Sequence, residues 1–112
     1  MTAAFMRGEV HWVELDPVVG SEISKTRPCV VLSANEINTR RKTVVVVPLT
    51  STSNDPSFPL LIAVPSAGLG TSVRTDQIRC IDKSRLRGHV GRVSQDDLNA
   101  ISRAITKVLD LH

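Results

Sequence analysis

Each of two short segments of the chain carries, at one end of an apolar strand, polar side chains that suit a phosphate group. In the first, Arg27 leads through a proline into the apolar run at residues 29–32. In the second, the β-branched run at residues 43–49 leads into the hydroxyl side chains of residues 50–53. If the two strands are antiparallel neighbours, the start of one lies beside the end of the other, so Arg27 and Thr50 share one pocket. A permanently charged planar guanidinium beside a hydroxyl donor suits a phosphodiester.

Such a pocket suits the cleavage of RNA by its own 2′-hydroxyl, which gives a 2′,3′-cyclic phosphate and a free 5′-hydroxyl. A protein that catalyses this step removes the proton from the 2′-oxygen, stabilises the charge on the phosphorus and protonates the leaving oxygen. No metal is needed, because the nucleophile is already tethered to its target. In this interpretation Arg27 grips two phosphate oxygens and Thr50 donates a hydrogen bond to the same group. Glu22, in the loop before Arg27, is the nearest carboxylate that can act as the base.

Histidine, cysteine and metal chemistry are weaker alternatives. The three histidines, His11, His89 and His112, show no spacing that makes a pair, so each is interpreted as a structural or surface residue. Cys29 and Cys80 lie in expected strands with no CxxC pair and no Cys/His cluster, so both are interpreted as small buried hydrophobic residues. The acidic residues are scattered, which disfavours two-metal cleavage of DNA. The sequence therefore predicts no metal site and no cofactor.

Length and composition favour one small domain. The chain has 112 residues, of which 41% are hydrophobic, and a net charge of +3. No apolar run approaches the roughly 20 residues of a membrane-spanning helix, and no signal peptide is recognised, so a cytoplasmic location without membrane contact is expected. Residues 1–6 are expected to be a loose leader and residues 7–112 a single domain. Six basic residues against two acidic ones between Arg74 and Arg92 indicate either a surface for a polyanion or a solvated face.

The elements that position these groups are expected to be mostly strands. They are predicted at residues 10–15, 27–32, 43–49, 60–64, 71–73, 77–82 and 87–93. Ser33 and Glu36 form a capping-box pattern that predicts a short helical turn over residues 36–38. Ser94 is predicted to cap the main helix, whose apolar stripe is interpreted first as core and second as a dimer contact. The stripe consists of Leu98, Ile101, Ile105, Val108 and Leu109. This order predicts an α+β fold, a small and strongly bent antiparallel sheet or half-open barrel with a C-terminal helix packed against it.

An ordered set of short motifs spans almost everything after Met6. The motifs are Arg7-Gly8-Glu9-Val10, Leu15-Asp16-Pro17, Gly20-Ser21-Glu22, Arg27-Pro28-Cys29-Val30-Val31-Leu32-Ser33, Val47-Pro48-Leu49-Thr50-Ser51, Gly68-Leu69, Asp76-Gln77-Ile78-Arg79, Ile81-Asp82, Arg85-Leu86, Gly91-Arg92-Val93 and the closing helix. Single pieces are weak signals, but the ordered set is specific. It resembles the MazF/PemK family, also called Kid, of toxin–antitoxin ribonucleases.

This resemblance implies the SH3-like barrel shared with the gyrase-poisoning CcdB toxins. It implies the toxin of a type II toxin–antitoxin system that cleaves single-stranded mRNA at specific sequences without a metal, which inhibits translation and growth. It assigns catalysis to Arg27, Thr50 and Glu22. The RNA contacts implied with it are Lys25, Thr26, Ser51, Thr52, Ser53, Asp76, Gln77 and Arg79.

The resemblance also implies partners. The toxin would be a homodimer with RNA along the dimer face, a cognate MazE-like antitoxin would block that face with an extended acidic tail, and only the toxin–antitoxin complex would bind operator DNA. Aromatic residues make up only 3% of the chain, so hydrogen bonds are expected to carry more of the RNA recognition than stacking does. Two other classes stay open, a non-catalytic CcdB-like toxin and a non-catalytic nucleic-acid-binding module of the same fold.

Overall fold

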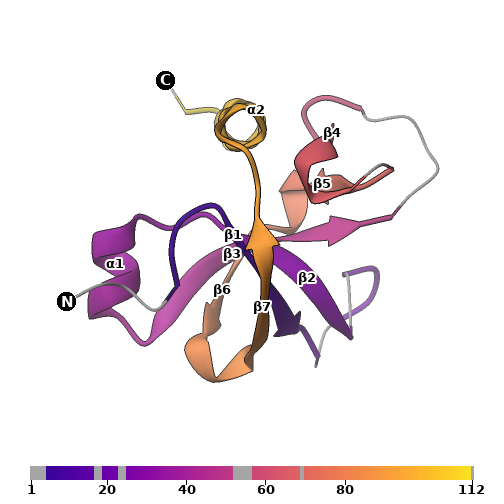
Figure 1. Ribbon diagram of the computed structural model, residues 1–112. Helices are drawn as coiled ribbons and strands as arrows, with labels where there is room; N and C mark the ends of the chain where they lie inside the picture. The colour runs from indigo at the N-terminus through magenta and orange to yellow at the C-terminus, as the bar shows by residue number, and fades with distance from the viewer. Residues whose placement is uncertain (1–4, 17–18, 23–24, 52–56, 69, 112) are drawn as a thin grey trace.

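The computed structural model describes residues 5–16, 19–22, 25–51, 57–68 and 70–111. The strands are β1 (Glu9–Glu14), β2 (Thr26–Val31), β3 (Thr43–Thr50), β4 (Leu61–Ala63), β5 (Ser72–Arg74), β6 (Arg79–Asp82) and β7 (Leu86–Arg92) (Figure 1). The helices are α1 (Asn35–Arg40) and α2 (Gln95–Val108), with short 3-10 helices η1 (Pro65–Ala67), η2 (Thr75–Gln77) and η3 (Lys83–Arg85). All seven predicted strands are present, with ends that differ by at most two residues.

The strands form one antiparallel, unclosed sheet in the order β4-β5-β3-β2-β1-β7. The long strand β3 is central, as predicted, because it pairs with β2 along one edge and with two strands along the other. Its first half pairs with β6 and its last two residues pair with β5, so the sheet divides at β3. Helix α2 lies at one end of the molecule, as Figure 1 shows. The prediction of an α+β fold with a bent sheet and a C-terminal helix is confirmed.

Buried apolar side chains form one cluster on each face of the sheet. Strand β2 contributes Val30 to the first cluster and Cys29 and Val31 to the second. The first cluster includes Leu98 and Ile101, so it is the core between the sheet and α2. Since successive side chains of a strand point to opposite faces, β2 and β3 bury both faces and read as continuous apolar runs in the sequence.

The start of α2 is as predicted. The Ser94 hydroxyl accepts a hydrogen bond from the Asp97 N–H at 3.1 Å, which satisfies one free donor of the first turn. Within the apolar stripe, Leu98 and Ile101 are buried, whereas Leu109 is half exposed. The stripe is therefore core in its first two turns. No helix among the described residues is long and apolar enough to cross a membrane.

The capping box predicted at Ser33 is wrong. Helix α1 is longer than expected and its N-cap is Ala34, with no side-chain cap. The Ser33 hydroxyl instead binds the buried Asn38 side chain and accepts the Val45 N–H at 3.0 Å. The buried Asn38 amide needs hydrogen-bond partners, and the Ser33 hydroxyl serves as one of them instead of capping the helix.

The expected leader, residues 1–6, is described only in part. Residues 1–4 lie outside the described residues, whereas Phe5 packs against the second cluster and the Met6 N–H donates to Glu9 at 2.7 Å.

The two cysteines differ in burial. Cys29 is fully buried, as predicted. The same prediction is wrong for Cys80, which is exposed, because its face of β6 is not covered by either cluster.

Candidate functional site

The antiparallel pairing of β2 and β3 brings the two polar segments together. The register pairs Cys29 with Pro48, Val30 with Val47 and Val31 with Val46. Continued by two residues, it sets Arg27 opposite Thr50, on the same face of the sheet. The condition on which the sequence argument rested, that the two strands are antiparallel neighbours, is confirmed.

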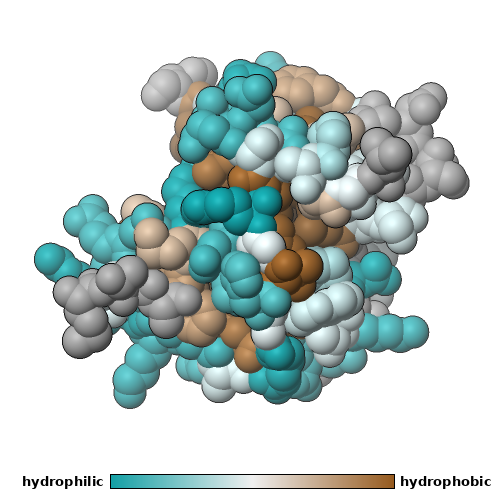
Figure 2. All heavy atoms as spheres, viewed as in Figure 1, coloured by the Kyte–Doolittle hydropathy of each residue, from teal (hydrophilic) through white to brown (hydrophobic). Residues whose placement is uncertain are grey.

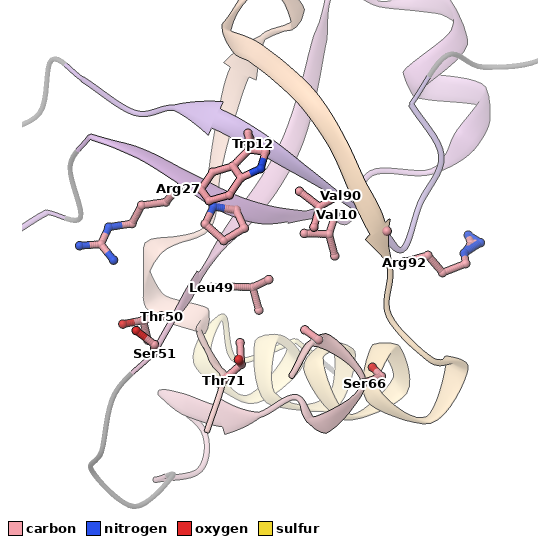
Figure 3. Close-up of a pocket in the computed structure, with 13 residues that line it drawn as sticks. Val10, Trp12, Arg27, Leu49, Thr50, Ser51, Ser66, Thr71, Val90 and Arg92 are labelled. Atoms are coloured by element: carbon pink, nitrogen blue, oxygen red, sulfur yellow. The ribbon is translucent and has the colours of Figure 1, made fainter. Parts of the chain in front are cut away.

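Arg27 and Thr50 line one cavity of about 490 Å³. Figure 3 shows the Arg27 guanidinium on the same side of this cavity as the hydroxyls of Thr50 and Ser51. The opposite wall is largely apolar, and Figure 2 shows apolar side chains gathered in the hollow beside β7 and below α2. The described lining residues are Val10, Trp12, Arg27, Pro28, Leu49, Thr50, Ser51, Ser66, Ala67, Thr71, Val90, Gly91 and Arg92. The cavity therefore combines a cationic, hydroxyl-bearing end with an apolar surface.

The second arginine of the cavity is directed elsewhere. The Arg92 guanidinium donates to the Arg7 carbonyl at 2.7 Å and points away from Arg27 in Figure 3. The basic head group beside the hydroxyls is thus that of Arg27, whose side chain is half-buried. A guanidinium that is partly shielded from water binds an anion more strongly than an exposed one does.

Three of the predicted residues lie outside the cavity, two in the loop between β1 and β2 and one at the first position of β2. Glu22 is exposed and its carboxylate accepts the Val19 N–H at 2.7 Å. Lys25 and Thr26 are also exposed, and the Lys25 N–H donates to Asp16 at 3.0 Å. The structure therefore brings Arg27, Thr50 and Ser51 together but does not bring Glu22, Lys25 or Thr26 to the cavity lining.

The remaining predicted RNA contacts lie in other elements. Asp76 in η2 is within 3.5 Å of the Arg74 guanidinium, and Gln77 follows it in the same turn. Arg79 opens β6, where it pairs with Val46. None of these three lines the cavity, and Thr52 and Ser53 lie outside the described residues.

The positive charges of Arg79 and Arg27 both influence the pKa of the Cys29 thiol. Burial raises the pKa of Cys29 to about 12, and the charges of Arg79 and then Arg27 oppose that rise. The thiol is therefore neutral at physiological pH, which excludes it as a nucleophile because thiolate is the reactive form. The interpretation of Cys29 as a buried hydrophobic residue agrees with this result.

The sequence interpretation did not assign Trp12, Ser66 and Thr71 to the site. Trp12 is 44% exposed and lies over the cavity in Figure 3. Alternation along β1 gave no signal for this exposure, because Trp12 shares its face with the buried Val10 while Val13 is buried on the other face. The sequence expectation had favoured hydrogen bonds over stacking, and the cavity contains an aromatic surface on which a base can stack.

The expectation that no two histidines pair is wrong. His11 and His89 face each other across β1 and β7, with ring centroids 5.1 Å apart. Glu9 lies between them, with its oxygens 3.2 Å from His11 Nε2 and 3.6 Å from His89 Nε2. Strand pairing, which sequence spacing does not reveal, creates this cluster. None of the three residues lines the cavity that holds Arg27.

Comparison with known proteins agrees with this geometry. Residues 6–109 match the family model described as the PemK-like, MazF-like toxin of type II toxin–antitoxin systems. The chain belongs to this family. It is 39% identical to the endoribonuclease MazF9 of Mycobacterium tuberculosis over 94% of this chain and 96% of that protein. The resemblance stated from the sequence motifs is therefore confirmed.

Solved structures of this family share the fold. A mycobacterial endoribonuclease in complex with its cognate antitoxin is 27% identical, with a TM-score of 0.80 over 97% of this chain and 98% of that chain. MazF of Deinococcus radiodurans superposes with a TM-score of 0.82 over 95% of this chain and 96% of that chain, at 24% identity. The second likeness supports the fold alone.

Proposed function

We propose that this MazF/PemK-family protein is a cytoplasmic endoribonuclease toxin that cleaves single-stranded mRNA at specific sequences without a metal. The observation that carries the proposal is the shared cavity of Arg27 and Thr50, which offers a guanidinium and a hydroxyl to one phosphodiester. Cleavage of mRNA inhibits translation and so arrests growth. The name of the M. tuberculosis relative, an endoribonuclease, supports the reaction class.

In this mechanism Arg27 binds two phosphate oxygens with its planar fork and stabilises the charge that develops on phosphorus. Thr50, with Ser51 beside it, donates a hydrogen bond to the same phosphate or to the leaving 5′-oxygen. The 2′-hydroxyl of the substrate attacks the phosphorus and gives its proton to Glu22 or to water. The P–O5′ bond breaks and the leaving 5′-oxygen takes a proton from water, which gives a 2′,3′-cyclic phosphate and a 5′-hydroxyl. Trp12 provides a face on which a neighbouring base stacks.

Removal of the 2′-proton falls to Glu22 or to water. The described lining of the cavity contains no carboxylate and no imidazole. Glu22 lies outside this lining, in the glycine-containing loop between β1 and β2 that precedes Arg27. Lys25, Thr26, Thr52, Ser53, Asp76, Gln77 and Arg79 extend the RNA surface beyond the cavity in this proposal.

The proposed partners follow from the family. The protein acts as a homodimer with RNA along the dimer face. A MazE-like antitoxin with an acidic tail competes for that face, where the Arg27 guanidinium attracts carboxylates as it attracts phosphate. A solved mycobacterial relative is in complex with its cognate antitoxin, which supports this partner. Operator DNA is bound only by the toxin–antitoxin complex.

The test is incubation of purified protein with single-stranded RNA in EDTA, followed by mapping of the ends. We expect 5′-hydroxyl and 2′,3′-cyclic phosphate ends, abolished by Arg27→Ala and reduced about 10²-fold by Thr50→Ala, the cost of one preorganised donor. Arg103→Ala and Thr106→Ala are matched controls, since both residues lie on the exposed side of α2. Full activity of Arg27→Ala contradicts the assignment. RNA that is bound but left whole by the wild type points to a non-catalytic module, and RNA neither bound nor cut points to a CcdB-like toxin.

The role of Glu22 has its own test. Glu22→Gln keeps the size of the side chain and removes its basicity. If Glu22 is the base, the single-turnover cleavage rate falls while RNA binding is unchanged. An unchanged rate assigns proton removal to water.

A further inference from the structure

A cluster of one carboxylate and two imidazoles lies outside the proposed catalytic cavity. Glu9 and His11 come from β1 and His89 comes from β7, and their ligand atoms all lie within 4.8 Å of one another. The side chain of His11 is only 6% exposed and that of Glu9 is 21% exposed, whereas His89 is 54% exposed. The cluster thus has a fixed inner part and one side open to solvent.

A β-bulge places His89 in this cluster. Val10 pairs with Gly91, but the next residue of β1, His11, pairs with His89, so Val90 is the extra residue. Without this shift, His11 would face Val90. The bulge turns the Val90 side chain to the cavity seen in Figure 3 and brings His89 opposite His11. Bulges commonly redirect side chains in this way at functional positions.

The donor set suits a transition-metal ion. Two imidazole nitrogens and one carboxylate oxygen are typical of zinc sites with an open fourth position, whereas Mg²⁺ and Ca²⁺ prefer oxygen ligands alone. Tetrahedral ligands about 2.0–2.1 Å from zinc lie roughly 3.3 Å from one another. Glu9 Oε1 lies 3.2 Å from His11 Nε2, Glu9 Oε2 lies 3.6 Å from His89 Nε2, and one ligand atom from each of the three residues lies within 4.8 Å of the others. Movement of the exposed His89 side chain would bring its nitrogen to tetrahedral spacing from His11 and from a single Glu9 oxygen.

Glu9 and His11 are held in place by their neighbours. The Glu9 carboxylate accepts the Met6 N–H at 2.7 Å, and Phe5 packs edge-on against the His11 ring at a centroid distance of 5.1 Å. Contacts of this kind orient metal ligands before the ion binds.

We propose that Glu9, His11 and His89 form a site for one Zn²⁺ per chain, with water as the fourth ligand. The ion joins β1 to β7, which is an edge strand of the sheet, and fixes the segment at Phe5 and Met6. It is separate from RNA cleavage, because none of its ligands lines the cavity of Arg27 and Thr50. Its expected role is to stabilise the fold in proportion to the free zinc concentration.

The test uses untagged, EDTA-treated and dialysed protein titrated with ZnCl₂ against a chromophoric chelator, with the melting temperature as a second readout. We expect one Zn²⁺ per chain and a melting temperature that rises with zinc. His89→Ala should weaken zinc binding at least about tenfold, since even loss of an outer-shell partner costs a metal site that much. His112→Ala, which removes the remaining histidine of the sequence, should bind zinc as the wild type does. Co²⁺ in place of Zn²⁺ should give the visible absorption of a four-coordinate site.

His89 is the decisive position because its exposed side chain can be removed without disturbing the core. Equal zinc binding by His89→Ala and the wild type, or no binding by the wild type at micromolar zinc, overturns the proposal. His11→Gln is a second variant, and its loss of binding counts only if its unfolding transition remains cooperative. We expect RNA cleavage to proceed equally with and without zinc. The zinc site and the proposed RNA cleavage are therefore tested independently, and either proposal can be refuted while the other stands.

Discussion

At the scale of single residues, the geometry of a guanidinium distinguishes Arg27 from a simple positive charge. Its planar fork can donate two parallel hydrogen bonds to one phosphate, whereas an ammonium group offers a point charge. The half-buried position of Arg27 beside Thr50 and Ser51 suits the fork, because partial shielding from water strengthens charge-assisted hydrogen bonds.

Arg27→Lys separates charge from geometry. We expect its kcat/KM for RNA to fall at least about tenfold while RNA binding weakens less, because the lost hydrogen bond acts mainly on the transition state. The measurement is single-turnover cleavage together with RNA binding at two salt concentrations. Equal kcat/KM for Arg27→Lys and the wild type would show that charge alone is enough.

The two cysteines should differ in reactivity. Burial raises the pKa of Cys29 to about 12, so it should not react with a thiol reagent in the folded protein, whereas the exposed Cys80 should react at once. We expect one fast-reacting thiol in the native wild type, two in denaturant and none in native Cys80→Ser. A fast-reacting thiol in native Cys80→Ser would contradict the described burial of Cys29.

Much at this scale was predictable from the sequence, within clear limits. Arg27 and Thr50 were found because each flanks an apolar strand and antiparallel pairing aligns the two ends. His11 and His89 were not paired, because the bulge that aligns them depends on the register of two strands far apart in sequence. The exposure of Cys80 was missed because a strand pattern does not reveal which faces a small sheet leaves uncovered.

At the scale of elements, the start of α2 anchors one wall of the cavity. Ser66 of η1 lines the cavity, and its N–H donates to the Asp97 carboxylate at 2.9 Å. The Ser66 hydroxyl binds the same carboxylate and also accepts the Ser94 N–H at 2.9 Å. The first turn of α2 and η1 are therefore one hydrogen-bonded unit. The helix start was predictable from Ser94, but its link to η1 was not, because Ser66 is distant in sequence.

Asp97→Ala should loosen this unit. We expect it to lower the free energy of unfolding by about 1 kcal/mol, because the carboxylate accepts hydrogen bonds from both the N–H and the hydroxyl of Ser66 and lies at the positive end of the helix dipole. Asp96→Ala is the matched control, since Asp96 lies in the same first turn, and we expect a change within about 0.5 kcal/mol. Urea unfolding of the two variants measures the difference, and equal effects would show that the contact with Ser66 adds nothing to stability.

At the scale of the whole molecule, the sheet separates two apolar clusters. Phe5 packs against the second cluster, and the next residue, Met6, donates its N–H to the Glu9 carboxylate. The pKa of Glu9 is lower in the folded protein than its ordinary value of 4.5. Folding therefore favours the ionised form. The stability that Glu9 contributes is fully present above that value and is lost as the pH falls through the lower, folded pKa.

Glu9→Gln should show this linkage. With EDTA present, we expect the variant to be less stable than the wild type at pH 7 and to approach it as the pH falls below about 4.5. Glu36→Gln, which alters an exposed carboxylate in α1, serves as the control. Thermal unfolding between pH 3 and pH 7 is the measurement. A difference between wild type and Glu9→Gln that stays constant across this range would contradict the assigned pKa shift.

The most direct test of the central claim is a double-mutant cycle on single-turnover RNA cleavage with Arg27→Lys, Thr50→Ala and the combined variant. If both side chains act on one phosphodiester, their effects are coupled, and the rate of the double variant departs from the product of the single effects by about 1 kcal/mol or more. Effects that multiply within about 0.3 kcal/mol would show that Arg27 and Thr50 act at separate places, and the proposed shared site would be contradicted.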